Sequence, residues 1–455
     1  MKTTGKRSLV LYFLIALFVA GLGFFLAEFA FQGGEWAIQP FNKHITQGGV
    51  SGTITDRDNT VLAQSSNGER IYNEDPAVRC AMLQTVGDTR GYISTSVQYV
   101  YRAPLSGYNL VTGLYSPTGG GNGSKIQLTL DAELCKTAYN AMNGRKGSVL
   151  VYNYKTGEIV CMVSSPTFDP ASPPADLDTD ETGKYDGVYL NNVLSGLYTP
   201  GSTFKIVTAA AAIENISNLD EKTFVCNGSV VINGNKINCT GTHGQIDFKT
   251  ALARSCNVAF GELSVELGSE AMQKTAEQLG FGKRYSIDGI TTAASVYDVE
   301  DATSDGLAWS GIGQYTDLAN PYHMARLMGA IANGGTPVEP YFIKSVTTSF
   351  GLVTQSGHAI QGDSLMTAQT AERLKGYMRN NVTSYYGESL FPGLEICAKT
   401  GTAEVGGEKE PSAWIVGFSQ RQDTPYAFVV VVEEGGSGIQ AAGGVAGAVL
   451  QQAAK

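Results

Sequence analysis

The sequence predicts a mixed α/β (α+β) protein that is attached to a membrane by one N-terminal helix. Three observations support this prediction. The run from Leu9 to Ala27 contains no charged residue, and its length is about enough to cross a bilayer core as a helix. A small, apolar run at 206–213 follows a Pro-Gly pair, which is typical of a helix start. The apolar runs at 149–152 and 159–163 flank a Lys-Thr-Gly turn and predict a β-hairpin.

The residues around the N-terminal apolar run set the expected topology. Three basic residues lie within the first seven positions, and cations on the short N-terminal side favour keeping that end in the cytoplasm. We expect a cytoplasmic tail over residues 1–8, a membrane anchor over 9–31 and the rest of the chain outside the cell membrane. A cleaved signal peptide is the competing interpretation, but it needs a small-x-small cleavage site. The sequence Ala-Glu-Phe at 27–29 does not provide one.

The exported part is too long for one typical domain. A Gly-rich stretch at 118–124 interrupts the chain, so we expect a membrane-proximal domain over 36–143, called the pedestal below, and a second domain over 147–455. The net charge of −10, with no basic cluster beyond the N-terminal tail, argues against a nucleic-acid partner. The Gly-rich stretch also lacks the Lys-Ser/Thr of a phosphate-binding loop.

The segment Tyr-Thr-Pro-Gly-Ser-Thr-Phe-Lys at 198–205 contains the first candidate for chemistry. Ser202 and Lys205 lie three residues apart at the start of the predicted helix, so they share one helix face. A hydroxyl is a poor nucleophile until a base takes its proton, and a desolvated lysine is one of the few side chains that can do so. The lysine pKa must then fall by over three units from about 10.4. Burial and a second cation, for which Lys399 is the candidate, can both lower it.

Two further motifs follow in sequence. One is Ser-Cys-Asn at 255–257, and the other is Lys-Thr-Gly-Thr at 399–402, which lies between strand candidates at 394–398 and 412–418. Another Lys-Thr-Gly, at 155–157, precedes the serine and lies in the predicted hairpin turn, so we exclude it from the site.

Each of these residues also has a plain structural interpretation. Ser202 and Lys205 could be exposed on a helix surface, where Ser-x-x-Lys arises by chance. Ser255 and Asn257 could cap the helix that follows, since both residue types are favoured caps. Lys399 could be a solvated lysine on a strand. Only the three motifs together favour a shared catalytic site.

Taken in order, the three motifs resemble those of class B penicillin-binding proteins, which are membrane-anchored peptidoglycan D,D-transpeptidases. Supporting matches lie at 52–63, 128–131, 310–314 and 320–321, with Asn320 where a threonine is commoner. The resemblance implies the penicillin-binding transpeptidase fold, which is similar to that of serine β-lactamases: an antiparallel sheet flanked by helices. It also implies a β-rich pedestal, one transmembrane helix and a small form without C-terminal accessory repeats.

The resemblance implies a serine acyl-enzyme mechanism. Ser202 would attack the penultimate D-Ala carbonyl of a stem peptide, and the acyl group would pass to an amine on a neighbouring strand. β-Lactams would acylate the same serine. Lys205 would act as base, Ser255 would relay the proton to the departing amine, and Asn257 would hold Lys205 and the substrate amide. Lys399 would supply positive potential for the terminal carboxylate.

The strand that carries the third motif is implied to bind the substrate. Thr400 and Thr402 offer hydroxyls to the carboxylate, with Thr402 the favoured contact. Gly401 has no side chain, so the substrate backbone could lie against the strand as an added β-strand. The backbone N–H groups of Ser202 and Thr402 would form the oxyanion hole.

The resemblance implies no cofactor and no metal. The implied partners are peptidoglycan stem peptides ending in D-Ala-D-Ala, β-lactams, a separate polytopic membrane glycosyltransferase and other wall-synthesis proteins. An additional glycosyltransferase domain is not expected, because the segment before Ser202 is accounted for by the pedestal and the start of the catalytic fold. Roles in elongation, division and sporulation stay open at this point.

Two rival functions share these motifs. A β-lactamase or a D,D-carboxypeptidase would use the same acylation with water as acceptor, although a β-lactamase has no need of a pedestal. A β-lactam sensor or a scaffold of the wall-synthesis complex would be non-enzymatic. A Ser-His-Asp hydrolase is poorly supported, because the chain has four histidines and no Gly-x-Ser-x-Gly elbow.

The seven cysteines do not form a disulfide scaffold. Cys226 and Cys239 flank a hairpin with Asn-Gly at its turn. Outside the cell they could pair as a disulfide. A zinc site with His243 and Cys256 is the competing hypothesis, and two free thiols are the third. The other four cysteines lie in apolar surroundings and are expected to be small core residues.

Overall fold

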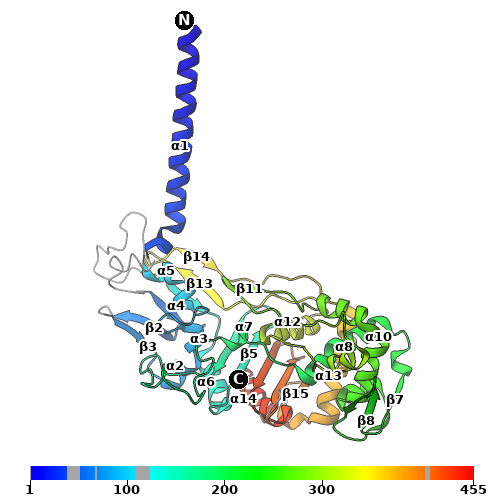
Figure 1. Ribbon diagram of the computed structural model, residues 1–455. Helices are drawn as coiled ribbons and strands as arrows, with labels where there is room; N and C mark the ends of the chain where they lie inside the picture. The colour runs from blue at the N-terminus through cyan, green and yellow to red at the C-terminus, as the bar shows by residue number, and fades with distance from the viewer. Residues whose placement is uncertain (1, 38–51, 67–68, 108–122, 405–409) are drawn as a thin grey trace.

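The computed structural model describes residues 2–37, 52–66, 69–107, 123–404 and 410–455. Helix α1 (Lys2–Ala37) projects as a single rod from the rest of the molecule (Figure 1). Its span Gly5–Phe29 has a mean hydropathy of 2.7, and none of it is buried against the protein. By length and composition this helix can cross a membrane. The Gly-rich stretch at 118–124 lies largely outside the described residues.

The catalytic part is built on a five-stranded antiparallel sheet. Its strand order is β15 (Ile396–Ala403), β16 (Ser412–Ser419), β17 (Tyr426–Val432), β5 (Gly147–Asn153) and β6 (Ile159–Ser165). The predicted hairpin at 149–163 is confirmed as β5 and β6, and Gly157 in its turn has a φ of +81°. Every residue of β16 is buried, so both faces of the sheet are covered.

Three helices pack on this sheet. They are α6 (Ala132–Met142), α12 (Pro321–Ala332) and α14 (Gly443–Ala453). Helix α12 contacts β5, β16 and β17, while α6 and α14 pack against each other and against β6 and β17 respectively. Helix α12 approaches β5 so closely that a Cβ at Gly329 would lie 1.6 Å from the Tyr152 hydroxyl oxygen. The antiparallel sheet with flanking helices is therefore as expected.

A second, largely helical group lies beside the β15 edge of the sheet (Figure 1). Its helices are α8 (Lys205–Asn215), α9 (Phe248–Ala253), α10 (Asn257–Gln278), α11 (Ser304–Ser310) and α13 (Ala368–Asn381). Helix α8 packs between α10 and α13, and α13 contacts β15. Small strands complete the group: β7 (Thr223–Cys226) with β10 (Gly244–Asp247), and β8 (Ser229–Ile232) with β9 (Asn235–Asn238). The short helix α7 (Asn192–Ser195) precedes α8 in the sequence. The strand pair β11 (Ser286–Ile287) and β12 (Ile290–Thr291) follows α10.

The pedestal sheet draws strands from both sides of the predicted domain boundary. Its order is β14 (Val353–Ser356), β13 (Ile343–Thr347), β4 (Lys125–Leu128), β1 (Thr53–Thr55), β2 (Val61–Ser66) and β3 (Glu69–Tyr72). Strands β13 and β14 belong to the segment predicted as catalytic. Because β13 pairs with β4, it covers an edge that would otherwise expose unpaired backbone groups.

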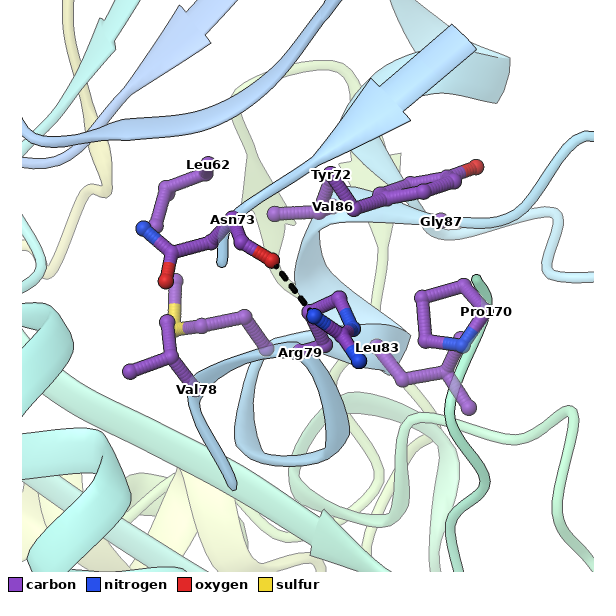
Figure 2. A pocket seen from close by; sticks show the side chains of 10 residues that line it. Leu62, Tyr72, Asn73, Val78, Arg79, Leu83, Val86, Gly87 and Pro170 are labelled. Atoms are coloured by element: carbon purple, nitrogen blue, oxygen red, sulfur yellow. Dashed lines mark hydrogen bonds between the residues drawn. The ribbon is translucent and has the colours of Figure 1, made fainter. Parts of the chain in front are cut away.

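The described part of the pedestal also contains four short helices. They are α2 (Pro76–Ala81), α3 (Leu83–Val86), α4 (Val97–Val100) and α5 (Arg102–Ser106). Arg79 on α2 donates to the Asn73 carbonyl oxygen at 2.8 Å and to both carboxylate oxygens of Asp169, at 2.7 and 2.6 Å. Pro170, next to Asp169, lines the same small pocket as pedestal residues such as Leu83 (Figure 2). The main buried core runs through both parts, and a smaller cluster that includes Leu83 and Phe168 also joins them.

Candidate active site

Ser202 lies in a 3₁₀ turn, η2 (Gly201–Phe204), that leads directly into α8. The α-helix therefore begins one turn later than predicted, and the serine precedes it. Ser202 is half-buried and Lys205 is completely buried. The Lys205 amine donates to the Ser202 hydroxyl at 2.8 Å, so the contact that their spacing predicts is present. An exposed position on a helix surface is excluded for Lys205.

Three further oxygens accept hydrogen bonds from the Lys205 amine. They are the Ser255 carbonyl at 3.0 Å, the Ser255 hydroxyl at 3.1 Å and Oδ1 of Asn257 at 2.7 Å. Burial lowers the Lys205 pKa to about 7, while nearby thiols oppose the shift. From the sequence we expected the charge of Lys399 to help lower the Lys205 pKa. Here burial lowers the Lys205 pKa, whereas burial first and then repulsion from Lys205 lower the pKa of Lys399.

The Ser-Cys-Asn motif lies at the junction of α9 and α10. Ser255 has a φ of +54°, in a left-handed region that is uncommon for residues other than glycine. The N-cap of α10 is Cys256, whose sulfur accepts from the Ala259 N–H at 3.5 Å. The side chains of Ser255 and Asn257 therefore do not cap the helix. Asn257 bonds to Lys205, and its Nδ2 donates to the Asn238 carbonyl at 2.9 Å.

Lys399 is completely buried within β15. Its amine donates to the Ser255 hydroxyl at 2.9 Å and to the Thr400 carbonyl at 2.8 Å. The Ser255 hydroxyl thus lies between the two lysine amines, one on α8 and one on β15. Burial first, and then the charge of Lys205, holds the Lys399 pKa well below its usual range. A solvated strand lysine is excluded.

The Lys-Thr-Gly-Thr motif lies inside β15 and does not follow the strand, because the pairing with β16 continues through Ala403. The Thr402 side chain is exposed, and its hydroxyl accepts from the Gly438 N–H at 3.4 Å. Gly401 is buried, and a Cβ there would lie 2.8 Å from the Pro200 carbonyl oxygen and 3.0 Å from Cγ2 of Thr203. The packing of η2 on the strand therefore requires the glycine.

Strand β15 forms one edge of its sheet, and its outward backbone groups can be assigned from their partners. The Ile396 carbonyl accepts from Arg379 at 3.0 Å, and the Ala398 carbonyl accepts from Asn381 at 2.9 Å. Because backbone direction alternates along a strand, the N–H of Thr402 points to the same outer edge, which pairs with no other strand of the described chain and is open at this residue. Gly201 lies beside it, since a Cβ there would come within 2.7 Å of the Thr402 carbonyl oxygen.

Two contacts at the site were not predicted from the sequence. The Tyr386 hydroxyl lies 3.2 Å from both the N–H and the hydroxyl of Thr400. Burial raises the Tyr386 pKa. The Cys239 sulfur accepts from the Asn257 N–H at 3.3 Å. Neither residue belongs to a local motif, so only tertiary contacts reveal their positions.

All seven cysteines are free thiols in this structure, so the disulfide considered for Cys226 and Cys239 is not formed in it. The turn between them is a hairpin, as predicted, with φ of +49° at Asn233 and +80° at Gly234. The ligand atoms of four residues lie within 4.8 Å of one another; the residues are Cys226, Cys239, His243 and Cys256. The same four residues were considered for a zinc site from the sequence.

Residues 147–455 match the family described as the penicillin-binding protein transpeptidase domain. The peptidoglycan D,D-transpeptidase PbpA of Mycolicibacterium smegmatis is 29% identical over 398 residues, which cover 80% of this chain and 79% of that protein. Stage V sporulation protein D of Bacillus subtilis is 28% identical over 340 residues, which cover 72% of this chain and 51% of that protein.

Solved structures show the same fold. A ceftriaxone acyl-enzyme of penicillin-binding protein A from Mycobacterium tuberculosis has a TM-score of 0.79 at 24% identity, covering 90% of this chain and all of that chain. The D,D-transpeptidase domain of a peptidoglycan glycosyltransferase from Eggerthella lenta has a TM-score of 0.75 at 26% identity, covering 89% and 98%. With the family match over 147–455, this places the chain in the penicillin-binding protein transpeptidase family.

Proposed function

We propose that this chain is a class B peptidoglycan D,D-transpeptidase that works through an acyl-enzyme on Ser202 and is acylated there by β-lactams. One observation carries the proposal: the buried Lys205 amine lies 2.8 Å from the Ser202 hydroxyl and has a pKa near 7. A pKa in this range makes the neutral amine accessible at pH 7, and a neutral amine can accept the serine proton. The named relatives with this activity support the assignment.

Acylation follows from the network around Ser202. The hydroxyl oxygen bonds to the penultimate D-Ala carbonyl carbon, and its proton passes to the Lys205 amine. The Ser255 hydroxyl, which contacts both lysine amines, relays a proton to the nitrogen of the terminal D-Ala as the peptide bond breaks. The N–H groups of Ser202 and Thr402 receive the charge that develops on the carbonyl oxygen. Removal of one such donor typically lowers the reaction rate by roughly 10²–10³-fold.

Transfer reverses the same proton path. An acceptor amine attacks the Ser202 ester, the ester bond breaks, and the serine regains its proton. The exposed Thr402 hydroxyl binds the substrate's terminal carboxylate in the first step, and the buried Lys399 amine supplies positive potential for it. A carboxylate in that position raises the Lys399 pKa and so favours its charged form. The open edge of β15 accepts the substrate backbone as an added strand.

The proposed location is the outer face of the cell membrane. Helix α1 is the anchor, with the basic residues before its apolar span on the cytoplasmic side. A pedestal over 36–143 then raises a transpeptidase domain over 147–455 above the membrane. Polymerisation of the glycan would be performed by a separate polytopic glycosyltransferase. Protease added to spheroplasts should digest the catalytic domain and leave an N-terminal fragment; protection of the whole chain would contradict this orientation.

A fluorescent penicillin tests the acyl-enzyme on the purified full-length chain. We expect label on the wild type, none on Ser202→Ala, and persistence of the label after an excess of unlabelled penicillin is added. Loss of label within seconds would indicate a β-lactamase or carboxypeptidase instead.

A second assay separates a transpeptidase from a sensor or scaffold. Stem peptides ending in D-Ala-D-Ala, supplied with an acceptor amine, should give free D-Ala and a cross-linked product with the wild type. Ser202→Ala should give neither. Acylation by penicillin without any turnover of the peptide would favour the sensor.

A further inference from the structure

The geometry points to a structural Zn²⁺ site formed by Cys226, Cys239, His243 and Cys256, directly behind the Ser-Cys-Asn motif. We propose that the ion is bound by three thiolates and one imidazole and that it fixes the position of Ser255 and Asn257. The cluster is outside the proton-transfer network described above. Its thiolate and imidazole donors are those that favour zinc over magnesium or calcium.

The atom positions fit tetrahedral zinc. Zinc lies roughly 2.3 Å from thiolate sulfur and 2.0–2.1 Å from imidazole nitrogen. Tetrahedral angles then place two sulfurs about 3.8 Å apart, and a sulfur and a nitrogen about 3.6 Å apart. In the structure, the sulfurs of Cys239 and Cys256 are 3.8 Å apart, and the Cys239 sulfur is 3.6 Å from Nδ1 of His243. All four ligand atoms lie within 4.8 Å of one another.

The surroundings of the sulfurs also suit thiolates. The Asn257 N–H donates to the Cys239 sulfur at 3.3 Å, and the Ala259 N–H donates to the Cys256 sulfur at 3.5 Å. Both donors belong to the first turn of α10, where backbone N–H groups favour negative charge. Hydrogen bonds from outside the ligand shell orient ligands and stabilise their charged form. Four protein ligands leave no open position, so the site is structural and not catalytic.

The four ligands come from separate segments of the chain. Cys226 ends β7, Cys239 follows β9, and His243 precedes β10. Cys256 caps α10 and lies between the two residues that contact Lys205. The small strand pairs therefore provide three ligands, and the Ser-Cys-Asn loop provides the fourth. An ion at this point would hold the loop against the strands, including the left-handed backbone of Ser255.

The ligand set can be tested by metal analysis, which does not depend on catalysis. Full-length protein purified in detergent without added metal should contain about one zinc ion per chain. Cys226→Ser and His243→Asn should lose it, because each removes one of four ligands. Cys80→Ser is the matched control: Cys80 is a half-buried thiol outside the cluster, and its replacement should keep the zinc.

Cobalt provides a spectroscopic check of the same site. Chain stripped with chelator and reloaded with Co²⁺ should show the visible bands of tetrahedral cobalt and a thiolate charge-transfer band, and Cys226→Ser should lose both. A mass increase of the unreduced protein on reduction, showing a disulfide between Cys226 and Cys239, would overturn the proposal. So would a wild type that contains no more metal than Cys226→Ser.

The positioning role rests on the proposed function and has its own readout. Chelation should slow penicillin acylation by roughly tenfold to a hundredfold, since small displacements of catalytic groups have effects of that size. Zn²⁺ added back should restore the rate in the wild type but not in Cys226→Ser. Zinc-containing protein that is never acylated would contradict the proposed function and leave the metal site intact. Normal acylation by zinc-free protein would overturn the positioning role alone.

Discussion

Lys205 is bound by neutral oxygens: its four hydrogen-bond partners are two hydroxyls, an amide oxygen and a backbone carbonyl. Dipoles can orient an amine without stabilising its charge as a carboxylate would. Burial therefore dominates and lowers the pKa to about 7. A carboxylate at this place would hold the lysine in the charged form, which has no lone pair to accept a proton.

The first prediction concerns the pH dependence of acylation. The lysine acts only when neutral, so the second-order rate constant for a β-lactam should fall about tenfold per pH unit below pH 7 and level off above it. Stopped-flow acylation from pH 5.5 to 8.5 measures this. The profile of the free enzyme reports the free-enzyme pKa, and a flat profile would show that another group is the base.

The second prediction separates the hydroxyl of Ser255 from its backbone. Ser255→Ala and Ser255→Gly both remove the proton relay, so acylation should fall by roughly 10²–10⁴ in both. The φ of +54° strains alanine but not glycine. The free energy of unfolding of Ser255→Gly should therefore be higher than that of Ser255→Ala by about 1 kcal/mol. Chemical denaturation of both variants measures the difference; equal stability would show that the loop relaxes.

At the level of elements, the serine turn and strand β15 form one unit through close backbone contact. Glycines permit it on each side: a Cβ at Gly201 would meet the Thr402 carbonyl at 2.7 Å, and one at Gly401 would meet the Pro200 carbonyl at 2.8 Å. Gly313 supports the turn from behind, since its carbonyl accepts from the Gly201 N–H at 2.9 Å. The distance between the nucleophile and the substrate strand is thereby fixed by backbone atoms.

The third prediction tests this contact. Gly401→Ala forces η2 and β15 apart, so acylation should fall strongly and the free energy of unfolding by about 1–3 kcal/mol. Gly444→Ala is the control, because nothing lies within 4 Å of a Cβ there and the position is exposed on α14. It should keep full acylation and unfold no more easily. A Gly401→Ala variant with wild-type kinetics would contradict the packing argument.

In the whole molecule, the pedestal and the catalytic part share a continuous core and one sheet. Strands β13 and β14 complete the pedestal sheet from within the catalytic sequence. The bidentate pair between Arg79 and Asp169 adds a half-buried ionic contact between the two parts. Such a junction is expected to be stiff, because moving one part would break the sheet.

The fourth prediction concerns this junction. Arg79→Met should lower the free energy of unfolding by about 1.5–3 kcal/mol, since it removes charged hydrogen bonds from a half-buried carboxylate. Acylation of the folded protein should stay near that of the wild type, because the site lies elsewhere. Lys375→Ala, which breaks the exposed pair with Glu372, should change neither quantity. Loss of acylation without loss of stability in Arg79→Met would imply coupling between pedestal and site.

Short-range patterns predicted several elements correctly. The hairpin of β5 and β6, the Asn-Gly turn after β8 and the strand pair around Lys399 were all expected. Turn chemistry and apolar runs act over a few residues, so they can be interpreted without the fold. The start of α8 was placed one turn early and the end of β15 too soon. Helix and strand ends depend on the packing of neighbouring segments.

The sequence by itself determined the apolar helix, the residue types of the three motifs and the spacing that brings Lys205 to Ser202. These properties are local, so spacing and side-chain chemistry suffice. Only the tertiary structure decided that Ser255 bridges two buried amines, that Gly401 serves the packing of η2, and that a strand pair from the catalytic segment completes the pedestal sheet. Those features depend on desolvation and on contacts between segments distant in the chain, which no local pattern encodes.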